Sequence, residues 1–310
     1  MMNRRLLALS AVLTSSALAI GLAGCATTPS TQTDGLSIVA STNVYGDLAA
    51  SIAGDLATVT SIIDSPAQDP HSYEASAQEQ LAIANADLVI KNGGGYDPFI
   101  DSLVDSSGST ATVVSAVEAS GLLDDGAGDD SDAHAGGNEH VWYSVHGMSA
   151  VATAVTAALV EADADNSTVF ETNLENFIDE LDALEAETES IADEAGGGDV
   201  VVTEVVPVYL LNELGLADVT PEEFTEAIEE GADVPPLALQ ATLDLIASGD
   251  VRMLAYNEQT ASPETERLRT AAEEAGVPVV SFTETLPGAQ DYVSWMRANL
   301  EAVGTALNPS

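Results

Sequence analysis

The sequence predicts an α/β protein of two lobes, each a parallel sheet flanked by helices, joined by one long rigid helix. In both halves of the chain, short apolar segments alternate with amphipathic ones, which is the pattern of a parallel sheet covered by helices. A helical stretch from about 168 to 194, with apolar residues every three or four positions, separates the halves. A chain of 310 residues is long enough for two cores.

The first half should form the N-terminal lobe, over residues 36–165. Its elements are predicted from buried apolar runs and from amphipathic periods. A Gly- and Asp-rich segment, 122–139, has no apolar period and is expected to be a mobile loop, after which helix resumes near Met148. We expect strands at 37–42, 58–63 and 87–93, and helices at 43–55 and 76–86.

The second half repeats this alternation without a visible sequence repeat. The linking helix is assigned to 166–198, where three glycines close it, and the C-terminal lobe to 199–310. Each later strand is preceded by a helical segment, which again indicates parallel pairing. We expect these strands at 200–203, 251–257 and 277–282.

The start of the chain has the features of an export signal. Arg4 and Arg5 precede a short apolar run, and the string LAGC ends at Cys25, the only cysteine. This is a lipobox, which predicts a signal peptide over 1–24, lipid attachment at Cys25 and a flexible tether over 25–35. The alternative is an ordinary cleaved signal with an incidental cysteine. The lipobox implies that the mature protein lies outside the cell membrane, held by its lipid. No further apolar stretch of membrane-spanning length is expected, so the rest of the chain should be soluble.

Acidic residues dominate the composition. The chain has 51 Asp and Glu against 7 Lys and Arg, which gives a formal net charge of −44. Such a surface repels nucleic acid and anionic lipid head groups, so neither is an expected partner. Most of the carboxylates are explained by solubility in a salty medium, where ions screen their repulsion. Concentration of cations near a cleft is a secondary role.

Four side chains are candidates for one binding site. His71 follows the second predicted strand by a short loop, and His140 lies at the exit of the acidic loop. Glu204 and Glu284 each follow a strand of the second half. Because ligands of open parallel sheets bind outside the carboxyl ends of the strands, the four can converge between the lobes. Two imidazoles and two carboxylates form a coherent ligand set for a divalent metal, whose charge the carboxylates cancel.

Several motifs resemble those of a known family. They are DPHSYE (69–74), HVW (140–142), ADLVIKNGGGYDPFID (86–101) and ETLP (284–287). Together they look like the zinc/manganese substrate-binding lipoproteins of ABC importers, and the similarity covers nearly all of the chain after the leader. The resemblance implies two lobes joined by a long helix, one metal between them, a membrane ABC permease as partner and no enzyme activity. The chain is expected to be a monomer.

The resemblance also implies the ligands. His71 and His140 match the two N-lobe histidines of the family, Glu204 falls where members have His or Glu, and Glu284 where they have Asp or Glu. The loop before His140 is short and acidic, whereas zinc-type members often carry a long His-rich loop there. Zinc prefers nitrogen and sulfur donors, and manganese accepts carboxylate oxygens, so the cargo stays open between Zn²⁺ and Mn²⁺. Protonation of the imidazoles predicts weaker binding as the pH falls through about 6.5.

Two other functions are compatible with the sequence. A secreted zinc hydrolase needs an open coordination position and a base, and the chain has no HExxH helix. A surface adhesin with a structural metal is the other rival.

Residues around the candidate ligands have lesser roles. His134 either collects metal or belongs to a solvated loop, and His146 is expected to be exposed or to cap a helix. Asn257 and Gln259 are expected to hydrogen-bond the ligands. The glutamates of 222–230 are expected to be a solvated helix face, with docking to a permease as the lesser alternative.

Overall fold

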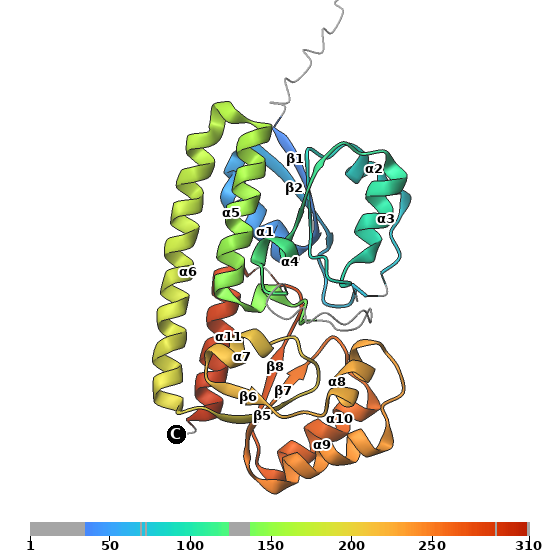
Figure 1. The fold of residues 1–310 in the computed structure, drawn as a ribbon, viewed down its shortest axis with the longest axis vertical. Coiled ribbons are helices and arrows are strands. Elements are labelled where there is room, and N and C mark those ends of the chain that lie inside the picture. Colours follow the sequence, from blue (N-terminus) through green and yellow to red (C-terminus); the bar gives the residue numbers. More distant parts are fainter. Residues whose placement is uncertain (1–34, 69, 72, 124–136, 289, 309–310) are drawn as a thin grey trace, which may run out of the picture. The chain divides into compact units, whose positions relative to one another are not determined.

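The computed structural model describes residues 35–308, except 69, 72, 124–136 and 289 (Figure 1). The predicted signal peptide, Cys25, the predicted tether up to residue 34, and His134 lie outside the described residues.

The first lobe is built on four parallel strands: β1 (Leu36–Thr42), β2 (Ala57–Ile63), β3 (Leu88–Lys91) and β4 (Thr112–Ser115). Their order in the sheet is β2-β1-β3-β4. The central strand β1 pairs with both β2 and β3, and it is buried from Ile38 onward. This burial on both faces explains why the segment is a continuous apolar run rather than an alternating one.

Short helices and 3₁₀ turns connect the strands of this sheet or follow the last one. They are α1 (Asn43–Ala53), α2 (Ala77–Ala84), α3 (Pro98–Ser107), α4 (Ala116–Ser120) and the 3₁₀ turns η1 (Gly54–Leu56) and η3 (Val141–Tyr143). A capping box starts α2, because Ser76 Oγ accepts from the Glu79 amide and the Glu79 carboxylate accepts from the Ser76 amide. Pro98 occupies the first turn of α3, where its missing N–H costs nothing.

Two long helices and a turn lead to the second lobe: α5 (Val145–Ala162), η4 (Ala164–Asn166) and α6 (Ser167–Ala195). The helix α6 has 29 residues and packs against α5 and α1 of the first lobe. It ends at Gly196, whose φ of 73° is the left-handed conformation that glycine adopts readily at a helix terminus. Figure 1 shows α6 running beside the elements of both lobes, as the prediction of a linking helix requires.

The second lobe is another parallel sheet, with strands β5 (Gly198–Val202), β6 (Leu216–Asp218), β7 (Val251–Asn257) and β8 (Val279–Phe282). Their order is β6-β5-β7-β8, so the central strands are β5 and β7. Its helices are α7 (Val208–Glu213), α8 (Glu222–Glu229), α9 (Pro236–Ser248), α10 (Pro263–Ala275) and α11 (Tyr292–Leu307).

The last helix, α11, joins the two lobes. It packs against α6 and also touches α1. The Tyr292 amide donates to Asp47 Oδ2 on α1 at 2.8 Å, and the Tyr292 hydroxyl donates to the carbonyl of Trp142 at 2.7 Å. Asn43 and Leu286 exchange two hydrogen bonds of 3.0 and 3.1 Å. These bonds hold the loop that follows β8 against the first lobe.

One apolar core runs through both lobes. It contains residues of α1 and α5, the inner face of α6, including Leu184, and residues of β5 and α11. Each sheet has a smaller core on its other face, which lies around Val39 in the first lobe and around Val201 in the second. Because the lobes share the largest core with α6, the linking helix is part of the folded body.

The predicted fold class is confirmed, with two additions. The strands β4 and β6 were not predicted: β4 has only four residues, half of them exposed, and β6 has three. The expectation of no further membrane-length apolar stretch was wrong, since α5 is long and apolar enough by composition. Half of α5 is buried, and it packs against α6 and α4, which explains its composition as that of a core helix.

Candidate metal centre

His140 is fixed in one orientation before η3. It is fully buried, and its Nδ1 lies 2.7 Å from Oδ1 of Asn138, an atom that also accepts from the His140 backbone amide. A carboxamide oxygen only accepts, so Nδ1 carries the proton and Nε2 holds the lone pair. Among the described residues, Nε2 has no hydrogen-bond partner. This nitrogen is therefore prepared to coordinate a cation.

His71 enters the same region from the loop between β2 and α2. Its ring meets Tyr96 edge-on, with centroids 5.1 Å apart, and Tyr96 contacts His140 in the same way at 5.8 Å. The ring of Trp142 lies 5.1 Å from that of His140. Tyr96 and Trp142 are buried, and their rings exclude water from one side of the two histidine rings.

Glu284 comes from the second lobe, just after β8, and is 2% exposed. Its backbone amide donates to Oε1 of Gln259 at 2.7 Å, and Oε1 of its carboxylate accepts from Asn257 at 2.8 Å. Its other oxygen, Oε2, has no hydrogen-bond partner among the described residues. Both expected partners, Asn257 and Gln259, are confirmed.

Glu204 follows β5 and is 1% exposed. Its Oε2 accepts from the Asn257 amide at 2.7 Å and from the Thr260 hydroxyl at 2.5 Å. Asn257, the last residue of β7, is oriented by the turn that follows, because its Oδ1 accepts from the Gln259 backbone amide. Its amide nitrogen therefore points at the two carboxylates, which it holds side by side.

The structure brings three of the four candidate ligands together. One ligand atom each from His71, His140 and Glu284 lie within 4.8 Å of one another. Glu204 does not belong to this group, although it adjoins Glu284 through Asn257. Metal–ligand bonds are about 2.0–2.2 Å long, so small side-chain movements let the three atoms share an ion.

Burial prepares these groups for a cation. Burial, and then the nearby His71, lower the pKa of His140 to about 3, so this imidazole is neutral at neutral pH. Burial, and then the charge of Glu204, raise the pKa of Glu284 to about 7. Two buried carboxylates repel each other, and a divalent cation between the imidazoles and these acids removes that cost.

A second group of ligand-type residues adjoins the first. His71, Glu139 and Glu229 also offer three atoms within 4.8 Å of one another. Sequence reasoning missed Glu139 and placed Glu229 on a solvated helix face. That assignment is correct for the exposed residues Glu222, Glu223, Glu226 and Glu230 but wrong for half-buried Glu229. Burial, and then Glu139, raise the pKa of Glu229 to about 8.

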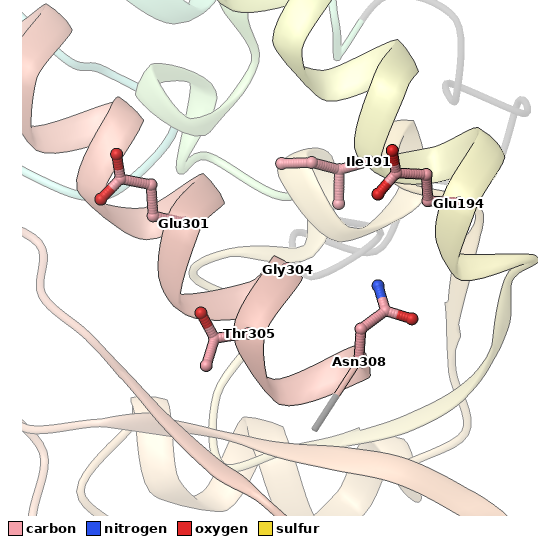
Figure 2. A pocket seen from close by; sticks show the side chains of 6 residues that line it. All are labelled: Ile191, Glu194, Glu301, Gly304, Thr305 and Asn308. Carbon is pink, nitrogen blue, oxygen red and sulfur yellow. The ribbon is translucent and has the colours of Figure 1, made fainter. Parts of the chain in front are cut away.

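Two other parts of the described chain, the region of His146 and a surface groove, do not present such a group of ligand atoms. His146 is exposed on the first turn of α5, as expected. A groove of about 610 Å³ lies between the ends of α6 and α11, and Figure 2 shows Glu194 and Glu301 on its two sides. No histidine or cysteine lines this groove, so it lacks the nitrogen and sulfur donors of the first site.

Comparison with known proteins decides the family. The family described as ZnuA, zinc-uptake complex component A periplasmic, matches residues 38–306. This chain belongs to that family. The ZnuA family consists of solute-binding proteins, so the chain is not an enzyme, and its assignment to the metal-binding proteins of ABC importers is confirmed.

The relatives of this chain are named for different metals. The manganese-binding lipoprotein MntA of Halalkalibacterium halodurans is 26% identical, over 94% of this chain and 96% of its own. The iron ABC transporter substrate-binding lipoprotein MtsA of Streptococcus pyogenes serotype M1 is 23% identical, over 90% and 91%. The laminin-binding adhesin Lmb of Streptococcus agalactiae shares the fold, with a TM-score of 0.73, 20% identity and coverage of 88% and 100%. The ZnuA-family cargo is thus a divalent metal, without one metal common to all.

Proposed function

We propose that this chain is an extracytoplasmic, lipid-anchored protein that captures one Zn²⁺ or Mn²⁺ ion between its lobes and delivers it to a membrane ABC permease. The proposal includes the domain boundaries expected from the sequence, the anchor at Cys25 and a monomeric state. Its ligands are His71 and His140 from the first lobe and Glu204 and Glu284 from the second.

The observation that carries this proposal is the pairing of unsatisfied, buried ligand atoms across the lobes. His140 and Glu284 each place one ligand atom in a group within 4.8 Å, and each side chain has one buried atom, His140 Nε2 and Glu284 Oε2, without a hydrogen-bond partner among the described residues. Leaving a buried polar atom unpaired costs about 1–3 kcal/mol. A cation bound there satisfies both atoms, which explains why the fold retains them.

Capture requires little rearrangement of the backbone. His140 is held by Asn138, and Glu284 by Gln259, so both ligands are oriented before the ion arrives. Glu204 completes the set by turning one carboxylate oxygen toward the ion while Asn257 and Thr260 hold the other. Because the ligands come from both lobes, separating the lobes removes about half of the coordination. The permease would release the ion by that movement.

The ligand set favours manganese over zinc on chemical grounds. Two carboxylates can supply more than two oxygens, which suits ions that accept oxygen donors and high coordination numbers. Zinc still binds most such sites more tightly than manganese when both are present, so affinity alone does not name the cargo.

Metal-limited growth tests the function. A strain lacking this gene should fail to grow in chelated medium, and either Mn²⁺ or Zn²⁺ at high concentration, but not both, should restore growth. The intact gene should restore growth at low metal, whereas a His140→Ala gene should not. Equal growth of the deleted and intact strains at every metal concentration would refute delivery to an importer.

The anchor has its own test. Globomycin, which blocks processing of lipoproteins, should leave the precursor uncleaved, and Cys25→Ala should have the same effect. A precursor processed normally in the drug and released as soluble protein would exclude attachment at Cys25.

A further inference from the structure

His71 belongs to two groups of potential ligands at once. Its partners in the inner group are His140 and Glu284, and in the outer group Glu139 and Glu229, with the ligand atoms of each group within 4.8 Å of one another. His71 is only half-buried, whereas His140 and Glu284 are almost fully buried. The outer group therefore lies on the solvent side of the inner one, with His71 between them.

The outer group is built from both lobes. Glu139 directly precedes His140 and is 8% exposed, and its carbonyl is held by the Asn92 side chain and the Val141 amide. Glu229 is the last residue of α8 in the second lobe and is half-buried. The carboxyl groups of Glu139 and Glu229, one from each lobe, have oxygen atoms within 4.8 Å of each other.

Two carboxylates this close repel each other. A divalent cation placed between them and the imidazole neutralises their charge, and carboxylate oxygens and imidazole nitrogens are ligands that transition metals accept. Both groups thus offer carboxylate oxygens and imidazole nitrogen as metal ligands, and the imidazole of His71 belongs to both. An ion can change position by exchanging one ligand at a time.

We propose that His71, Glu139 and Glu229 form an outer position for a divalent transition metal, which hands the ion to the inner site through His71. This inference rests on the proposed function, since it assigns the path to the inner site. The outer position is an intermediate of both entry and exit. Removing it must therefore slow association and dissociation by the same factor, and must leave the equilibrium affinity unchanged.

Three substitutions on α8 separate ligation from charge. Glu229→Gln removes a carboxylate ligand. Glu229→His removes the same carboxylate but keeps a metal ligand. Glu223→Gln, at an exposed position of the same helix, removes one charge and no ligand. Stopped-flow tryptophan fluorescence with Mn²⁺, and separately with Zn²⁺, gives association rates, chelator competition gives dissociation rates, and equilibrium titration gives affinity.

We expect Glu229→Gln to lower both rate constants about tenfold, the lower end of the effects seen for groups around a metal site. Glu229→His should restore most of the rate, and Glu223→Gln should behave as the unmodified protein. The outer position is refuted if Glu229→Gln matches Glu223→Gln, or if Glu229→His fails to restore the rates. A fall in affinity equal to the fall in association rate also refutes it, because Glu229 would then act on the inner site. Failure of the unmodified protein to bind one metal ion would instead refute the proposed function.

Discussion

Glu204 and Glu284 share one hydrogen-bond donor, the side-chain nitrogen of Asn257, which lies 2.7 Å from Glu204 Oε2 and 2.8 Å from Glu284 Oε1. The two acids follow different strands, β5 and β8, and Asn257 ends β7 between them. Without this donor, two buried carboxylates would face each other with nothing between them. Asn257 thus prepares one half of the metal centre before the ion binds.

Replacement of Asn257 by alanine should weaken metal binding about 10- to 100-fold, because groups that orient metal ligands have effects of that size. Isothermal titration with Mn²⁺ measures the change. Asn212→Ala, at an exposed position of α7, is the matched control and should bind as the unmodified protein does. Unchanged affinity in Asn257→Ala would show that the acids need no such support.

Replacement of Glu204 by glutamine tests whether this residue joins the ion. As a direct ligand, it should contribute more than a group that only orients ligands, so we expect affinity to fall at least about 100-fold. Glu258→Gln, nearby but exposed, removes the same charge and should have little effect. If metal affinity falls by the same small factor in both variants, Glu204 is not a ligand.

Metal affinity should rise with pH up to about 7 and then level off. Metal binds the deprotonated form of Glu284, whose pKa burial and Glu204 raise to about 7, so below this pH each ion must displace a proton. Affinity should therefore rise by nearly tenfold per pH unit between pH 5 and 6.5.

The structure removes His140 from the groups expected to take up the proton and adds Glu284. His140, whose pKa is lowered to about 3, is already neutral throughout this range. Titrations with Glu284→Gln should have a shallower pH dependence than those with the unmodified protein. Identical slopes for the two proteins would show that Glu284 does not carry the displaced proton.

The sequence named His71, His140 and Glu284, which the structure brings together, but not Glu139 and Glu229 of the outer group. Glu204, Asn257 and Glu284 could be predicted because each follows a strand, and the strand ends of a parallel sheet meet at one edge. Glu229 had no such signal, since it ends a helix in a run of similar acids. Only the tertiary structure brings its side chain close to His71 of the first lobe. The same reason explains the missed strands β4 and β6, which depend on neighbours more than on their own residues.

The shared core makes α6 a stabilising element and not only a connector. Leu184 is fully buried in the core that spans both lobes, so Leu184→Ala should lower the free energy of unfolding by about 2–5 kcal/mol. Val169 is exposed on the same helix and provides a control. Its replacement by alanine should change the free energy of unfolding by about 0.5 kcal/mol or less. Urea unfolding measures both. An equally small effect of the two changes would show that α6 lies outside the cooperative unit.

The central claim is that imidazoles of the first lobe and acids of the second hold one ion. Anomalous diffraction from crystals grown with Mn²⁺, recorded at the manganese edge, measures this directly. We predict one strong peak within about 2.0–2.4 Å of His71, His140 and Glu284 atoms, and its loss in His140→Ala. Equal occupancy in the His140→Ala protein, or a peak bound by residues of one lobe only, would contradict the account.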